Sequence, residues 1–272
     1  MVGTRTHVDV DEGAARDAIL DTWAGAALRA VAAVGVGGVN GIGIAMPAPF
    51  DYRRGVSLMQ HKFRALYGLP VLALLDERFR RSPLKDVRIV VANDADLFAL
   101  GEWWAGAAQG RRRMIGLTLG TGLGSGFVAD GRIVTRGPEV PPEGEIWNLP
   151  YLEGVAEDYV SGRAITGTYT RATGQTLSAS QIGQRAEAGE PAARDAFAEL
   201  AVHLARILEP HVARFKPASI VVGGKIAHAW PAFGPRLAAA LAPVECQPSA
   251  RFEDATLLGA AALASSEAQS PD

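Results

Sequence analysis

Residues 89–134 read IVVANDADLFALGEWWAGAAQGRRRMIGLTLGTGLGSGFVADGRIV, and this stretch decides the fold. It opens with an apolar run at residues 89–92, which predicts a buried strand. Asn93 and Asp94 follow where that run stops. A helix is predicted next, because apolar side chains recur at three- and four-residue spacings: Leu97, Leu100, Trp103 and Trp104.

A second apolar run at residues 114–119 predicts another strand, and it ends in the glycine-rich segment 120–126. A further strand is predicted at residues 127–129. Asp130 and Gly131 then form a hairpin turn before a last strand at residues 132–135. The segment is therefore expected to be a glycine-rich turn between two strands.

A carboxylate at a strand end, followed by a glycine-rich turn, indicates phosphoryl transfer. Asp94 could act as the base for an acceptor hydroxyl, and backbone amides in the turn could bind phosphates. Both features also have structural explanations, since Asp94 could cap the following helix and the glycines could form a tight hairpin.

Two standard nucleotide motifs are excluded. A dinucleotide fingerprint needs a third glycine where Ser125 stands, and it must open a helix. A P-loop needs Gly-Lys-Ser/Thr, whereas Gly224 and Lys225 are followed by Ile226.

Composition describes an ordinary globular protein of 272 residues with 48% hydrophobic and 21% charged residues. A net charge of −2 gives no reason to expect nucleic acid, and the basic run at residues 111–113 is expected to be a solvated loop. Cys246, the single cysteine, cannot form an internal disulfide. The N-terminus lacks a signal-peptide core and no apolar run spans a bilayer, so we expect a cytoplasmic protein without membrane contact.

Elsewhere the pattern alternates between strands and helices, which predicts an α/β fold. Strands are expected at residues 6–10, 41–46 and 219–222. Helices are expected at residues 12–34, 71–80, 164–171, 178–188, 191–215 and 255–264, with a helix-like segment interrupted by Pro231.

The order of motifs resembles the ROK family of bacterial sugar kinases and repressors, in the actin-like ATPase superfamily. The resemblance covers about residues 41–263 and rests on NDAD (93–96), TLGTGLGSGF (118–127), GEI (144–146) and EDYVSGRAI (157–165). It implies a two-lobed actin-like ATPase (ribonuclease H-like) fold with a central cleft. Residues 1–92 with 255–272 would form a small N-terminal lobe, and residues 93–254 a large lobe with the sugar and nucleotide sites.

The resemblance also implies roles for particular residues. Asp94 would be the catalytic base, while Asn93, Glu145 and Glu157 would orient the sugar. Asn148 stands where the family usually has a histidine and could donate one hydrogen bond in its place. His61 would face the sugar cleft, although a lone histidine is more often structural or exposed.

The nucleotide site implied by the resemblance has two parts. Gly120, Thr121 and Gly122 would hold phosphates, and Gly223 with Gly224 would form the adenosine-binding turn. ATP and Mg²⁺ are the expected cofactors, with the metal held mostly by phosphates and water. Many family members carry a cysteine-rich zinc loop, but here residues 149–157 read LPYLEGVAE, so we expect no structural zinc.

The resulting prediction is a glucokinase-like, ATP-dependent kinase acting on a hexose, with the 6-hydroxyl of glucose as acceptor. The alternatives are a kinase for an amino sugar or a C7-cyclitol, and a non-catalytic sugar-binding protein. Family repressors carry a helix-turn-helix domain that this sequence does not show, which argues against DNA binding. A homodimer is expected.

The beginning of the family pattern is not found. The family starts with a strand pair bearing Asp-x-Gly-Gly-Thr, which grips the β- and γ-phosphates, and nothing here matches it. Either the true start lies upstream or part of the nucleotide site is lost. We therefore expect an incompletely paired sheet in the N-terminal lobe and weak binding of ATP.

Overall fold

The computed structural model describes residue 5, residues 7–34 and residues 39–265. It divides into two compact units, Met1–Asp94 with Ala260–Asp272, and Ala95–Gly259. Each unit has its own core of buried apolar side chains, so the two are treated separately.

The parallel sheet of the first unit consists of two strands. Strand β1 (Ile42–Met46) runs beside β4 (Ile89–Asn93), with Met46 opposite Asn93. Both strands therefore end at the same edge of the sheet. The chain between them forms short elements and one helix: β2 (Phe50–Asp51), β3 (Val56–Ser57), η1 (Arg64–Leu66) and α2 (Val71–Phe79).

The strand expected at residues 6–10 is not formed. His7 to Val10 have no regular secondary structure, and Thr6 lies outside the described residues. Helix α1 (Arg16–Val34) begins four residues later than predicted, because Asp11 Oδ1 accepts a hydrogen bond from Gly13 N–H and holds a turn there. Among the described residues this unit has two two-stranded sheets, the parallel pair β1–β4 and the antiparallel pair β2–β3.

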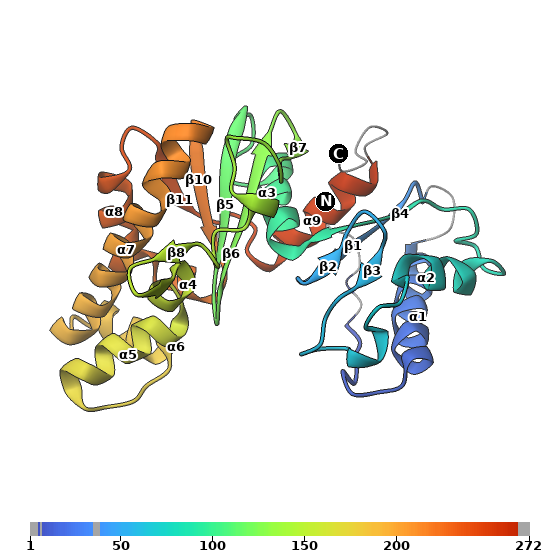
Figure 1. Ribbon diagram of the computed structural model, residues 1–272, viewed down its shortest axis with the longest axis horizontal. Coiled ribbons are helices and arrows are strands. Elements are labelled where there is room, and N and C mark those ends of the chain that lie inside the picture. Colours follow the sequence, from blue (N-terminus) through green and yellow to red (C-terminus); the bar gives the residue numbers. More distant parts are fainter. Residues whose placement is uncertain (1–4, 6, 35–38, 266–272) are drawn as a thin grey trace. The chain divides into compact units, whose positions relative to one another are not determined.

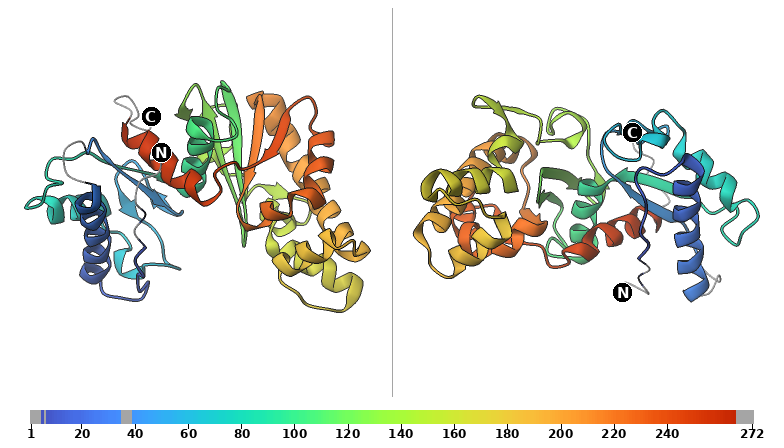
Figure 2. Two further views of the ribbon diagram at one scale, coloured as in Figure 1. Left: turned by 180° about the vertical axis from the view of Figure 1, so that it is seen from behind. Right: turned by 90° about the horizontal axis from the view of Figure 1, so that it is seen from below.

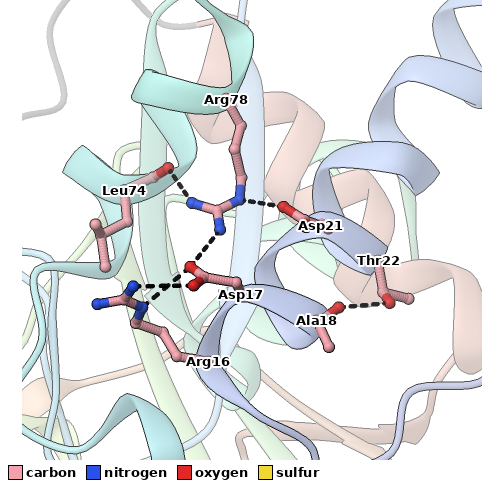
Figure 3. A network of polar contacts seen from close by, with 7 residues as sticks. All are labelled: Arg16, Asp17, Ala18, Asp21, Thr22, Leu74 and Arg78. Atoms are coloured by element: carbon pink, nitrogen blue, oxygen red, sulfur yellow. Dashed lines mark hydrogen bonds and ion pairs between the residues drawn. The ribbon is translucent and has the colours of Figure 1, made fainter.

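Arg78 of α2 links this helix to α1 by hydrogen bonds, and its side chain is only 19% exposed (Figure 3). Its guanidinium donates to Asp21 at 2.7 Å and to Asp17 at 2.9 Å, and to the carbonyl of Leu74 at 3.1 Å. This fork of charge-assisted bonds fixes the angle between the two helices over the apolar core of the unit.

The second unit is built on a five-stranded sheet of order β11-β10-β5-β6-β7. Strand β10 is parallel to β5 and β11, whereas β5, β6 and β7 form an antiparallel meander. The strands are β5 (Arg113–Leu119), β6 (Leu123–Ala129), β7 (Arg132–Ile133), β10 (Ser219–Gly223) and β11 (Glu245–Pro248).

The two faces of this sheet pack on different helices (Figures 1 and 2). Ile115 and Leu117 point into a core shared with the long helix α7 (Pro191–Phe215). Gly116, on the opposite face, packs so closely on α3 (Asp94–Ala105) that a Cβ there would lie 2.6 Å from Ala99 Cβ. The lack of a side chain at Gly116 thus allows α3 to lie close to the sheet.

The remaining elements follow β7 in the chain and belong to the second unit, except that α9 continues from the second unit into the first. They are η2 (Pro142–Gly144), β8 (Pro150–Tyr151), β9 (Gly154–Val155), α4 (Ala156–Tyr159), α5 (Gly162–Thr173), α6 (Ala179–Glu187), η3 (Lys225–Ala229), α8 (Trp230–Ala240) and α9 (Glu253–Ser265). Pro231 lies at the start of α8, where its missing N–H costs nothing, so it begins this helix instead of interrupting one.

The basic run is neutralised within its own unit. Arg111 pairs with Glu245, Arg112 with Asp130 at 3.0 Å, and Arg113 with Glu139. Arg111 and Arg112 are exposed, as expected of a solvated loop, whereas Arg113 is the first residue of β5 and its side chain is only 29% exposed. No helix formed by the described residues is long and apolar enough to cross a membrane.

Candidate active site

Asn93 and Asp94 lie where β4 passes into α3. Asn93 Nδ2 donates a hydrogen bond to the hydroxyl of Tyr52 at 3.1 Å, and that hydroxyl donates to the carbonyl of Met46 at 2.9 Å. Tyr52 thereby links the ends of strands β1 and β4 by hydrogen bonds. The sequence analysis did not single out Tyr52, because no local pattern marks a tyrosine that bonds to a residue 41 positions away.

Asp94 is exposed at the first residue of α3. Exposure suits a base that must reach a substrate, and the helix start also suits a capping carboxylate. His61 lies in an exposed bend between β3 and η1, and no described residue hydrogen-bonds to its ring.

In the second unit, the glycine-rich turn is shorter than predicted, because β6 begins at Leu123. Gly120 N–H donates to the carbonyl of Gly122 at 3.0 Å, and the carbonyl of Gly120 accepts from Gly162 N–H at 2.8 Å. The amides of Thr121 and Gly122, at the apex, make no hydrogen bond to any described residue. Two successive amides without a protein partner, in an exposed turn, can bind an anion such as a phosphate.

Glu157 lies against this turn. Its Oε2 accepts a hydrogen bond from Leu123 N–H at 3.0 Å, and its Oε1 accepts one from Arg163 at 3.0 Å. A Cβ on Gly122 would overlap Glu157 Oε2, so a side chain at that position would displace the carboxylate. The structure therefore places an expected sugar ligand directly beside the expected phosphate-binding turn. Arg163, which donates to Glu157, is a further residue of the candidate site that was not predicted from the sequence.

Glu145 is partly buried, and its carboxylate accepts a hydrogen bond from Trp147 Nε1 at 2.9 Å. Burial raises the pKa of Glu145 above its ordinary value, although the indole N–H opposes this and Glu143 adds to it. A carboxyl group with a pKa raised by desolvation is a common mark of a functional site. Asn148 is exposed one residue beyond Trp147.

Gly223 and Gly224 end β10. Gly224 has a φ of 81°, and a Cβ there would overlap the backbone of Leu119, the residue before the glycine-rich turn. The two expected nucleotide-binding segments thus lie side by side in the second unit.

The acidic and imidazole side chains described by the structure form no group of three or more that could hold a metal ion. ATP fits the residues present, since the open amides of Thr121 and Gly122 suit its phosphates. Mg²⁺ would then have to be held mainly by phosphate oxygens and water.

Comparisons with known proteins identify the family. Residues 26–267 match the ROK family. The chain belongs to the ROK family. Among ROK relatives, an N-acetyl-D-glucosamine kinase of Photobacterium profundum is 30% identical over 237 residues, which covers 78% of this chain and 73% of the relative. A glucokinase of Thermotoga maritima is 28% identical over 253 residues, which covers 82% and 78% respectively.

The fold agrees with this membership. The ROK hexokinase from Thermus thermophilus superposes with a TM-score of 0.78 and 28% identity, covering 94% of this chain and 88% of that one. The predicted α/β, actin-like ATPase fold class is confirmed. Within this ROK protein, Asn93, Asp94 and His61 belong to the first unit. The second unit holds all other expected site residues: Gly120, Thr121, Gly122, Glu145, Asn148, Glu157, Gly223 and Gly224.

Proposed function

We propose that this ROK protein is an ATP-dependent sugar kinase that phosphorylates a hexose hydroxyl, with the 6-hydroxyl of glucose as the leading candidate. The observation that carries the proposal is the contact between Glu157 and the glycine-rich turn. A carboxylate that can accept hydrogen bonds from sugar hydroxyls lies beside amides that can donate hydrogen bonds to phosphate oxygens, which is the pairing that a sugar kinase requires.

The chain's own residues supply the base and the orientation. Asp94 accepts the hydroxyl proton as the sugar oxygen forms its bond to phosphorus. The neighbouring sugar hydroxyls are held by Asn93, Glu145 and Glu157. Further hydrogen bonds to the sugar come from Asn148 and His61. ATP, bound with Mg²⁺, supplies the γ-phosphoryl group and leaves as ADP.

Nucleotide binding is assigned to the second unit. The amides of Thr121 and Gly122, with Gly120 behind them, hold phosphate oxygens, and the Gly223–Gly224 turn admits the adenosine. Because these contacts are few, we propose weak affinity for ATP·Mg. Calorimetric titration with a non-hydrolysable ATP analogue tests this, and micromolar affinity would contradict it.

Two alternatives stay open within the proposal. The relative named N-acetyl-D-glucosamine kinase, and Asn148 in place of the usual histidine, favour an amino sugar, and a C7-cyclitol is the third candidate substrate. A sugar-binding protein without turnover is the rival of a different class. We further propose a cytoplasmic homodimer without nucleic-acid partners, which light scattering on the purified protein tests for its oligomeric part.

The deciding experiment is a coupled ATP-consumption assay over glucose, mannose, glucosamine, N-acetylglucosamine and a C7-cyclitol, with calorimetric binding of each compound in parallel. Sugar-dependent ADP release supports the kinase and names its substrate. Binding without ADP release would leave the non-catalytic sugar binder.

A further inference from the structure

The segment that follows Glu145 is a closed hairpin, which we call the 147–157 hairpin. Glu157 N–H donates to the carbonyl of Trp147 at 3.0 Å, and Ala156 N–H donates to that of Leu149 at 3.0 Å. The antiparallel pair β8–β9 continues the ladder to the tip. At the first end of the hairpin, the Trp147 indole N–H donates a hydrogen bond to Glu145. At the other end, Glu157 accepts one from the glycine-rich turn at Leu123 N–H.

One side chain of the hairpin anchors it to the helices below. Tyr151 packs edge-on against Tyr159 at 5.2 Å and against His203 at 5.6 Å, both measured between ring centroids. The Tyr151 hydroxyl also shares a hydrogen bond of 2.9 Å with His203 Nδ1. His203 belongs to α7, the longest helix of the unit (Figure 1), and its side chain is only 14% exposed. The anchor is thus part of the rigid scaffold.

The residues that Tyr151 packs against border a pocket. A cavity of about 110 Å³ lies between α4, α5 and α7 and is bordered by Tyr159 and His203. Asp158, also on its wall, uses its carboxylate to accept a bond from Val155 N–H at 3.0 Å. No described side chain fills this pocket, and the directional bond from Tyr151 to His203 is one of the contacts that link the hairpin to α7.

We propose that Tyr151 and His203 are positioning residues that hold the 147–157 hairpin, and through it Glu145 and Glu157, in the geometry that binds sugar. This inference rests on the proposed function for its effect on the reaction. The hairpin contains no cysteine, so its shape depends on these contacts and its backbone ladder. Loss of the Tyr151–His203 bond should therefore loosen both carboxylates together and leave the nucleotide turn in place.

The test compares Tyr151→Phe with a matched control, Tyr159→Phe. Both remove one hydroxyl and keep the ring, but the Tyr159 hydroxyl makes no hydrogen bond to the described residues. Loss of one hydrogen bond predicts a roughly three- to tenfold rise in the KM for sugar in Tyr151→Phe, with kcat and the KM for ATP within about twofold. Tyr151→Phe combined with His203→Leu should be no worse than the poorer single variant, because both remove the same bond.

Hydrogen exchange of the peptide covering residues 147–157 provides a readout that does not need catalysis. The amides of Ala156 and Glu157 should exchange faster in Tyr151→Phe than in Tyr159→Phe. Unchanged exchange with an unchanged sugar KM would overturn the proposal. A lowered melting temperature with kcat and both KM values altered alike would overturn it too, since that marks general destabilisation. If the wild type phosphorylates none of the sugars, the proposed function fails, and the exchange rates alone decide the role of Tyr151.

Discussion

Tyr52 holds the amide of Asn93 by a hydrogen bond of 3.1 Å while its own proton is given to the carbonyl of Met46. Since Met46 and Asn93 are the last residues of the paired strands β1 and β4, this one hydroxyl fixes the orientation of a side chain at the sheet edge. Asn93 directly precedes Asp94, so Tyr52 acts on the part of the proposed site contributed by the first unit.

Tyr52→Phe should therefore weaken sugar binding and leave nucleotide binding unchanged. Removal of one neutral hydrogen bond predicts a roughly three- to tenfold higher KM for sugar, because the Asn93 amide loses one of the bonds that orient it. Tyr67→Phe is the matched control, since Tyr67 belongs to the same unit and is 50% exposed. Steady-state kinetics with each substrate varied in turn measure the effect. Equal sugar KM values in the two variants would show that Tyr52 serves only the strand ends.

Asp94→Asn separates catalysis from capping. Asparagine is as good a helix cap as aspartate and keeps the size of the side chain, but it cannot accept the hydroxyl proton. We expect sugar affinity within a few-fold of wild type and a loss of turnover of at least about a hundredfold, the usual scale of general-base catalysis. Calorimetry and the coupled assay give the two numbers. Near-normal turnover would make Asp94 a capping residue only.

The elements that the sequence predicts well are those whose signal is local. Strand β5 and helix α7 have regular apolar patterns, and their bounds match the prediction to within a residue; helix α3 was predicted after Asp94 without bounds. Strand β6 was predicted four residues too short, because Gly124 and Gly126 were assigned to a turn. These two strand positions hold glycine because α3 and the neighbouring strand leave no room for a side chain there.

What the sequence could not predict are contacts between distant residues. The strands of the 147–157 hairpin are two residues long and contain Pro150 and Gly154, so they show no alternation. The bonds of Tyr52 to Asn93 and of Tyr151 to His203 join residues 41 and 52 positions apart. Such pairs depend on the whole fold, and no local pattern of residue types encodes them.

Glu145→Gln should raise stability while lowering sugar affinity. Burial raises the pKa of Glu145 in the folded state above the ordinary value of 4.5, so folded protein binds more protons than unfolded protein just above that pH. Stability therefore falls as the pH rises through this window, and the penalty persists at neutral pH. Glutamine carries no charge and escapes the penalty.

Thermal melts of wild type and Glu145→Gln between pH 4 and pH 8 measure this effect. The variant should melt higher at neutral pH, with the difference shrinking toward the acid end. Sugar titration of both proteins at pH 7 measures the functional cost. A variant that melts lower than wild type at pH 7 would show that the carboxylate stabilises the fold, contrary to this account.

Gly122→Ala should disturb both halves of the proposed site in the second unit. The added Cβ would overlap Glu157 Oε2, so the carboxylate must move away and lose its 3.0 Å bond to Leu123 N–H. Gly122 does not have a positive φ, so the backbone itself tolerates alanine and the effect is steric. We expect at least roughly tenfold weaker sugar binding, the scale of one charged hydrogen bond, together with weaker nucleotide binding because the apex of the turn shifts.

Gly167→Ala in α5 is the control, since its nearest neighbour is an arginine nitrogen at 3.6 Å and alanine favours a helix. Calorimetric titration of sugar and of a non-hydrolysable ATP analogue should show both affinities reduced in Gly122→Ala and neither in Gly167→Ala. Wild-type sugar affinity in Gly122→Ala would mean that the position of Glu157 against the turn does not matter for binding.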